Sequence, residues 1–184
     1  MKEYKIIDNF LSEKDANEIE KYFIEYLPWF YLGHTCEEDE IFRLKQRYEN
    51  MKEFVNQFSH NFMYQYDTLP PSEHSHIIKA ILDKMDKRFK ILRIKSNLIP
   101  KDTSFKDYEH HCPHTDNDAD HVTAIYYVNP SDGDTFLFLK EDNTIRVSPV
   151  KNRLLIFEGN ILHAGASPRQ NQCRMVINLN FKKI

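Results

Sequence analysis

Histidines and aspartates gather in one short segment, EHHCPHTDNDADH at residues 109–121. In an extended backbone, residues i and i+2 project to the same side. His114 and Asp116 can therefore present an imidazole and a carboxylate to one metal ion. A third ligand must come from another part of the chain, and His163 is the only histidine after residue 121.

Two histidines and one carboxylate form the ligand set that holds iron(II) by one triangular face. The opposite face stays open, so a 2-oxo acid can take two positions and dioxygen the third. A structural zinc site would instead use four protein ligands, usually with thiolates. A His-x-Asp pair alone is a weak signal, because it also occurs as a hydrogen-bonded pair in loops. Four further residues of the segment are predicted to lie outside the ligand set: His110, His111, Cys112 and His121.

The segment CRMVINLNF at 173–181 predicts a strand with two different faces, because alternate side chains point in opposite directions. One face is apolar, and the other carries Arg174, Val176, Asn178 and Asn180. Arg174 follows His163 by eleven residues, across a turn that contains Gly165 and Pro168. An antiparallel return would place its guanidinium where a metal-bound five-carbon diacid ends. Arginine can bind a carboxylate through two parallel hydrogen bonds.

The first half of the chain predicts a mixture of helices and strands that would support these residues. Residues 4–7 and 29–33 predict short strands, and alternation over 57–66 predicts another. Ser12 is a predicted helix cap, and Ser72 is predicted to cap a second helix. The acidic stretch Glu37–Glu40 predicts a solvated loop.

The second half is strand-rich. Strands are predicted at residues 89–99, 122–128, 135–140, 144–147, 153–158 and 173–181, separated by Asp/Gly/Asn/Pro turns. Short strands in this number favour a sandwich, jelly roll or barrel. Since no linker separates the halves, we expect one domain over residues 1–184, with 1–87 as a support region and 88–184 as the catalytic core.

Composition restricts the partners. A net charge of −3 gives no electrostatic reason to expect nucleic acid. The three cysteines form no CxxC pair, which disfavours a zinc ribbon or a disulfide framework. The N-terminus lacks the pattern of a signal peptide, and no apolar run reaches the roughly 18 residues that span a bilayer. A cytoplasmic protein without a membrane partner is expected, and its oligomeric state is not indicated.

Five motifs together resemble the iron(II)/2-oxoglutarate oxygenases, and the prolyl-4-hydroxylase-like branch with small microbial and phage members is the most similar. They are PHTD, VTAIYYVN, SDGDTFLF, NRLLIFEGNILHAG and CRMVINLNF, in the family's order over about residues 88–181. The resemblance implies a mainly β fold with flanking helices, the double-stranded β-helix (a cupin-like jelly roll). It also implies iron on His114, Asp116 and His163, with Arg174 on the distal carboxylate of 2-oxoglutarate.

Further positions follow from the resemblance and from strand alternation. Tyr127 matches a family tyrosine that assists at the distal carboxylate, and Thr123 lies on the same strand face. Asn97 stands where relatives often have a tyrosine that contacts the cosubstrate, which is a departure from the family pattern. Arg93 and Lys95 share the strand face of Asn97, so one of them is expected to point toward the pocket. Asn178 and Asn180 complete the residues expected around the cosubstrate.

The implied reaction uses Fe(II), 2-oxoglutarate and O2, with ascorbate as a candidate accessory reductant. It hydroxylates a C–H bond of an amino acid, a peptidyl (for example prolyl) residue or a small molecule, and releases succinate and CO2. Asp116 favours hydroxylation, because related halogenases have a small residue in place of this carboxylate. Two alternatives stay open: a non-catalytic β-helix that binds metal or 2-oxoglutarate as a sensor or structural protein, and a metal-dependent hydrolase or isomerase on a cupin-like barrel.

Overall fold

The computed structural model of the chain describes residues 3–33, 38–53, 56–64, 70–86, 88–139 and 143–183. Its elements, in chain order, are β1 (Tyr4–Ile7), α1 (Glu13–Glu25), β2 (Phe30–Leu32), α2 (Glu38–Lys45), β3 (Gln57–Tyr64), the 3-10 helix η1 (Glu73–Ile78), α3 (Lys79–Lys84), β4 (Phe89–Pro100), β5 (Val122–Tyr127), β6 (Thr135–Phe138), β7 (Thr144–Val147), β8 (Arg153–Glu158), β9 (Leu162–Gly165) and β10 (Cys173–Lys183). None of the helices in these ranges is long and apolar enough to cross a membrane.

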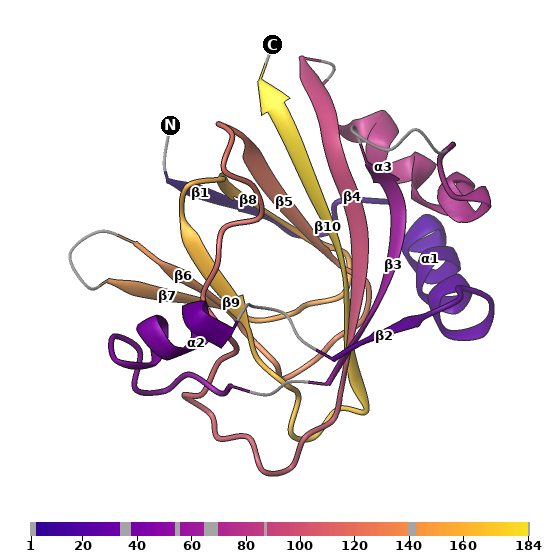
Figure 1. Cartoon of the computed structure of the whole chain (residues 1–184). Helices are drawn as coiled ribbons and strands as arrows, with labels where there is room; N and C mark the ends of the chain where they lie inside the picture. Colours follow the sequence, from indigo (N-terminus) through magenta and orange to yellow (C-terminus); the bar gives the residue numbers. More distant parts are fainter. Residues whose placement is uncertain are drawn as a thin grey trace.

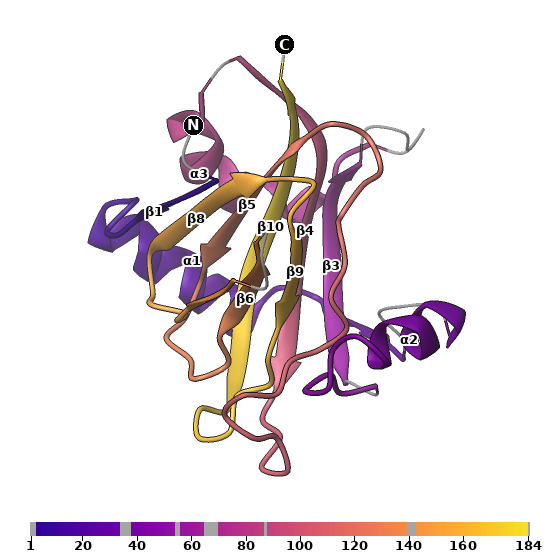
Figure 2. The same ribbon diagram turned by 90° about the vertical axis from the view of Figure 1, so that its left-hand side faces the viewer.

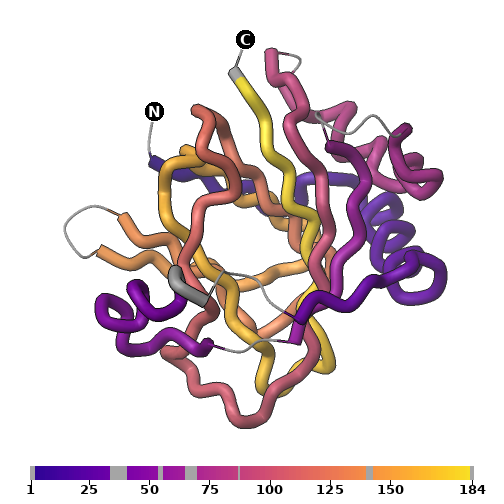
Figure 3. Tube along the Cα trace, viewed as in Figure 1, coloured from indigo at the N-terminus to yellow at the C-terminus, as the bar shows by residue number. Residues whose placement is uncertain are grey.

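The strands form two antiparallel sheets. The major sheet has the order β1-β8-β5-β10-β4-β3-β2, and the minor sheet has the order β7-β6-β9. The sheets lie opposite each other (Figure 1), and Figure 3 shows the trace running as two opposed walls. Their inner faces pack together, since Tyr127 and Val176 of the major sheet share a buried cluster with Leu137 and Val147 of the minor sheet. This arrangement is the double-stranded β-helix that the sequence predicted.

Helices cover the outer face of the major sheet, where α1, η1 and α3 lie together (Figure 1). Phe23 of α1 and Ile81 of α3 pack into one core with Tyr126 and Ile177 from the sheet. The predicted cap is confirmed, because the Ser12 hydroxyl accepts a hydrogen bond from the Asp15 backbone N–H at 3.1 Å. The predicted second helix is divided into η1 and α3.

The loop prediction for the acidic stretch Glu37–Glu40 is wrong from Glu38 onward. Glu38 begins α2, while Glu37 lies outside the described residues. The helix brings Ile41 and Leu44 to half-buried positions, and Arg43 and Lys45 in its last turn complement the helix dipole. Most of the acidic stretch therefore forms the beginning of a helix and not a loop.

The Asn152 side chain links the segment before α1 to β5, which makes it a test of stability. It has a positive φ of 64°. Its side-chain oxygen accepts from the Leu11 N–H at 2.8 Å and the Tyr126 hydroxyl at 3.2 Å, and its amide donates to the Leu11 carbonyl at 3.0 Å. Asn152→Ala should lower the free energy of unfolding by about 2–3 kcal/mol, because it leaves buried polar groups unpaired and a side chain at positive φ.

Urea denaturation measures this loss. Asn171→Ala, at an exposed position without positive φ, is the control and should stay within about 0.5 kcal/mol of the parent protein. Equal stability of the two variants would contradict the role of Asn152.

Candidate metal centre and cosubstrate pocket

Three potential metal ligands from two separate segments of the chain lie close together. His114 and Asp116 lie on the long connection between β4 and β5, and His163 lies in β9. Their ligand atoms all lie within 4.8 Å of one another. His114 and His163 exchange two backbone hydrogen bonds of 3.0 Å, so the connection is joined to the edge of the minor sheet (Figure 2). This pairing sets the two imidazoles side by side, with ring centroids 4.7 Å apart.

Backbone carbonyls orient both imidazoles. Nδ1 of His114 lies 3.0 Å from the Cys112 carbonyl, and Nδ1 of His163 lies 3.3 Å from the Ile161 carbonyl. Since a carbonyl can only accept, each Nδ1 carries the proton and each Nε2 keeps a lone pair for a ligand. Burial lowers the pKa of His163 to about 4, against the opposing effect of Asp116, so this imidazole is neutral at physiological pH.

The Asp116 carboxylate is held by the major sheet. It accepts hydrogen bonds from Arg93 at 2.7 Å, Asn178 at 3.0 and 3.1 Å, Asn180 at 3.0 Å and Thr123 at 3.2 Å. Burial raises its pKa, but the neighbouring histidines and Arg93 outweigh burial and hold the pKa well below its usual range. The site therefore offers two imidazole nitrogens and one ionised carboxylate, and this donor set fits iron(II).

The other histidines of the segment do not join this group. His110, His111 and His121 are all buried, so none of them is a surface residue. His110 packs among Phe136 and Phe138, and the His111 ring lies 3.1 Å from the Ser167 hydroxyl. The His121 ring rests against Gly159, where an added Cβ would come within 2.4 Å of it.

A cavity beside the triad contains the predicted arginine. It is lined by His114, His163 and Arg174 together with residues from β3, β4, β5 and β10. Arg174 is only 4% exposed and donates one hydrogen bond, of 2.7 Å, to the Thr135 hydroxyl. Its buried Nε has no hydrogen-bond partner, and no carboxylate of the described chain lies within ion-pair distance of it. A buried cation without an anion is costly, so the cavity suits a ligand carboxylate.

The polar residues predicted around the cosubstrate divide between two ends of the site. Tyr127 points inward, whereas Tyr126 packs against the helices, as the strand alternation predicted. Tyr127 reaches Arg174 through Thr135, to which its hydroxyl donates at 2.8 Å. Asn97 lines the cavity and accepts from the Gln57 amide at 3.3 Å. The remaining three residues donate hydrogen bonds to the Asp116 carboxylate: Thr123, Asn178 and Asn180. Of these, Asn178 also lines the cavity.

Removing the Tyr127 hydroxyl should have a small effect. Tyr127→Phe should weaken 2-oxoglutarate binding by about 0.5–1.5 kcal/mol, because one neutral hydrogen bond behind Arg174 is lost. Iron affinity should stay unchanged. Separate anaerobic calorimetric titrations of 2-oxoglutarate and of iron measure the two affinities, with Tyr126→Phe on the opposite strand face as the control. A loss as large as that of Arg174→Ala would mean that Tyr127 contacts the carboxylate itself.

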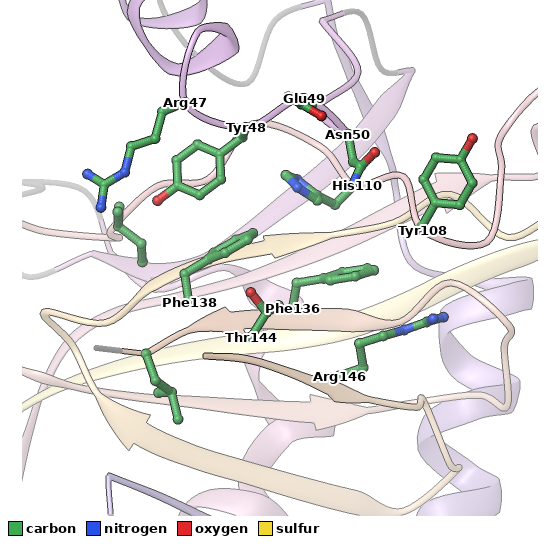
Figure 4. A pocket seen from close by; sticks show the side chains of 12 residues that line it. Arg47, Tyr48, Glu49, Asn50, Tyr108, His110, Phe136, Phe138, Thr144 and Arg146 are labelled. Carbon is green, nitrogen blue, oxygen red and sulfur yellow. The ribbon is translucent and has the colours of Figure 1, made fainter. Parts of the chain in front are cut away.

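A larger hollow lies elsewhere, on the outer face of the minor sheet. Its volume is about 480 Å³, and residues 47–50, His110, Phe136, Phe138 and Arg146 are among those that line it (Figure 4). Phe136 and Phe138 alternate along β6 with Thr135 and Leu137, which face the interior. The hollow is therefore separated from the triad by the minor sheet, and we assign the chemistry to the smaller internal cavity.

Comparison with known proteins agrees with this geometry. Residues 103–182, which contain the triad and Arg174, match the 2OG-Fe(II) oxygenase superfamily. This matched stretch is similar to the core of a 2OG-Fe(II) oxygenase. Oxygenases of this superfamily use Fe(II), 2-oxoglutarate and O2. No curated protein matches the sequence.

Solved oxygenase structures share the fold. A 2OG-Fe(II) oxygenase family oxidoreductase from Burkholderia pseudomallei has a TM-score of 0.71 at 12% identity, over 97% of this chain and 85% of its own. A prolyl hydroxylase from Trichoplax adhaerens, in complex with a hypoxia inducible factor peptide, gives 0.59 at 16% identity over 98% and 84%. The α-ketoglutarate-dependent epimerase SnoN of nogalamycin biosynthesis gives 0.63 at 10% identity over 98% and 78%. At these identities the likeness establishes the fold.

Several residues of the candidate site were not predicted from the sequence. Thr135 stood within the SDGDTFLF motif, but nothing in its type marks it as a partner of both Tyr127 and Arg174. Gln57 comes from β3 in the first half of the chain, whose relation to the site no local pattern reveals. One of Arg93 and Lys95 was expected to point toward the pocket or substrate, and in the structure Arg93 contacts Asp116.

Proposed function

We propose that this oxygenase holds iron(II) on His114, Asp116 and His163 and binds the distal carboxylate of 2-oxoglutarate on Arg174. The observation that carries the proposal is Arg174 itself, a buried guanidinium that opens on the same cavity as His114 and His163 and has no acidic partner within ion-pair distance in the described part of the chain. A cavity that binds only a metal would have no need of this cation.

The proposed reaction is hydroxylation of a C–H bond in an amino acid, a peptidyl residue (prolyl included) or another small molecule. When bound, iron(II) supplies the activation of dioxygen that couples decarboxylation of 2-oxoglutarate to oxidation of the substrate. One oxygen atom enters the C–H bond and the other enters succinate, and CO2 is released.

The protein's own residues bind and orient. The Cys112 and Ile161 carbonyls fix the imidazoles, and Arg93, Asn178 and Asn180 fix the Asp116 carboxylate. Apolar side chains of Ile99, Ile125 and Val176 line the same cavity as Arg174, His114 and His163, so part of its wall is apolar. In such a site charge-assisted hydrogen bonds are strong, because little solvent competes for them.

We also propose that residues 1–184 act as one domain. Strands β1, β2 and β3 from the first half belong to the same sheet as β5 and β10, which carry site residues. The support region and the catalytic core therefore share one hydrogen-bonded framework.

Substrate-dependent succinate formation tests the proposed function. Iron-loaded protein, 2-oxoglutarate and candidate substrates are incubated, and succinate and product mass are measured. Hydroxylation predicts succinate together with a product that has gained one oxygen atom. Succinate with a product of unchanged mass would instead favour epimerisation, the reaction in the name of SnoN. Binding of 2-oxoglutarate without succinate across the screen would favour the non-catalytic alternative.

A further inference from the structure

The inner face of β4 carries two cations next to Asp116, and they differ in their partners. Arg93 is fully engaged, since it donates to Asp116 at 2.7 Å and through Nε to the Asn180 side chain at 3.1 Å. Two residues along, Lys95 has no such contact. Within the ranges that the structure describes, no carboxylate lies within ion-pair distance of its ammonium and no hydrogen bond from it is found.

Strand geometry places Lys95 inside the double-stranded β-helix. Arg93 and Asn97, two residues to either side, both face the interior, and alternation gives Lys95 the same direction. It is paired with Asn178 of β10 and Asn61 of β3, its neighbours in the sheet (Figure 1). The side chain is half-buried. Burial and Arg93 lower the pKa of Lys95, whereas Asp116 raises it, so the ammonium lies within the electrostatic influence of the metal ligands.

Lys95 lies too far along the sheet to serve the cosubstrate anchor. Arg174 is paired with Ile99 and Asn178 with Lys95, so four residue positions separate the two cations along the strands. At about 3.3 Å per residue this separation is roughly 13 Å. Lys95 does not line the cavity that contains Arg174, so a five-carbon diacid that extends from Arg174 to the triad would not need Lys95 for its distal carboxylate.

We propose that Lys95 binds a carboxylate of the substrate whose C–H bond is oxidised. The substrate would then be a small carboxylic acid, free amino acids included, rather than a neutral peptidyl residue. An anion at this position would pair a half-buried ammonium that otherwise lacks a partner, and would hold the rest of the molecule beside Asp116. This inference rests on the proposed metal site only for the reaction that follows binding.

Binding is tested first without turnover. Saturation-transfer NMR compares free amino acids with their primary amides on iron-free protein, with 2-oxoglutarate present in excess to occupy Arg174. At least one acid should show a signal threefold or more above that of its amide. Lys95→Met should remove this preference and Lys95→Arg should retain it. Lys90→Met, at an exposed position of the same strand, should behave like the parent protein.

Equal signals for acids and amides, absence of any acid signal, or an acid preference that survives Lys95→Met would overturn the proposal. Turnover then separates it from the proposed function. In the parent protein the acid should stimulate succinate formation at least tenfold more than its amide at equal concentration, with a KM for 2-oxoglutarate that Lys95→Met leaves unchanged. Lys95-dependent binding without succinate would sustain the binding site and contradict the oxygenase reaction. Succinate formation that is equal for the acid and its amide would support the oxygenase reaction and contradict the proposed role of Lys95.

Discussion

His163→Ala should abolish turnover and reduce iron affinity by at least about 100-fold, since loss of a metal-orienting residue outside the ligand set already costs about 10- to 100-fold. The imidazole is neutral and buried, and its Nδ1 proton is held by the Ile161 carbonyl, so Nε2 is committed to the metal position. The backbone pairing of residue 163 with residue 114 does not need the side chain, so the fold should persist.

Anaerobic iron titration measures the affinity, and circular dichroism confirms that the variant is folded. His76→Ala is the matched histidine control, because His76 is exposed on η1 and remote in the chain from the triad. If His163→Ala kept full activity and iron affinity, the ligand assignment would be wrong.

Arg174→Ala should weaken 2-oxoglutarate binding by about 2–5 kcal/mol, or roughly 30-fold or more, because a buried charge-assisted contact is lost and the ligand carboxylate stays unpaired. Iron affinity should change little, since Arg174 contacts no proposed ligand. Arg174→Lys should recover only part of the loss, because an ammonium cannot form two parallel hydrogen bonds with a carboxylate.

Calorimetric titration of 2-oxoglutarate gives the dissociation constants. Arg153→Ala is the control, since Arg153 pairs with Asp8 away from the cavity. An unaltered dissociation constant for Arg174→Ala would mean that another residue binds the distal carboxylate.

Much of the fold followed from alternation and turn residues. The strands predicted at 4–7, 144–147 and 153–158 have those bounds in the structure. The exception is β9, which was not predicted although it carries His163. Its four residues, LHAG, are too short for a visible alternation and end in glycine. It forms because Phe136 and Leu137 of β6 pair with Ala164 and His163, and such long-range pairing leaves no mark in the local sequence.

The parts of the site made of rare combinations of residue types could be predicted, whereas the parts made of common polar residues could not. Two histidines and an aspartate at suitable spacing, with an arginine on an otherwise polar strand face, are a rare combination. Threonine and glutamine are common throughout protein sequences, so their residue type alone could not distinguish Thr135 and Gln57 from surface residues. The polar residues of β10 were recognised from the sequence. Only the register of β10 with β4 and β5 shows that the Asn180 amide is close enough to donate a hydrogen bond to Asp116.

The three proposed ligands are divided between the two walls of the molecule. His114 and His163 are tied to each other at the edge of the minor sheet, whereas Asp116 is hydrogen-bonded to β4, β5 and β10 of the major sheet. An ion bound by all three ligands would connect the two sheets. Its binding free energy would therefore add to the stability of the folded state. At a free metal concentration 100 times the dissociation constant, this linkage amounts to about 2.7 kcal/mol. The folded state would then be more resistant to unfolding in the presence of iron than in its absence.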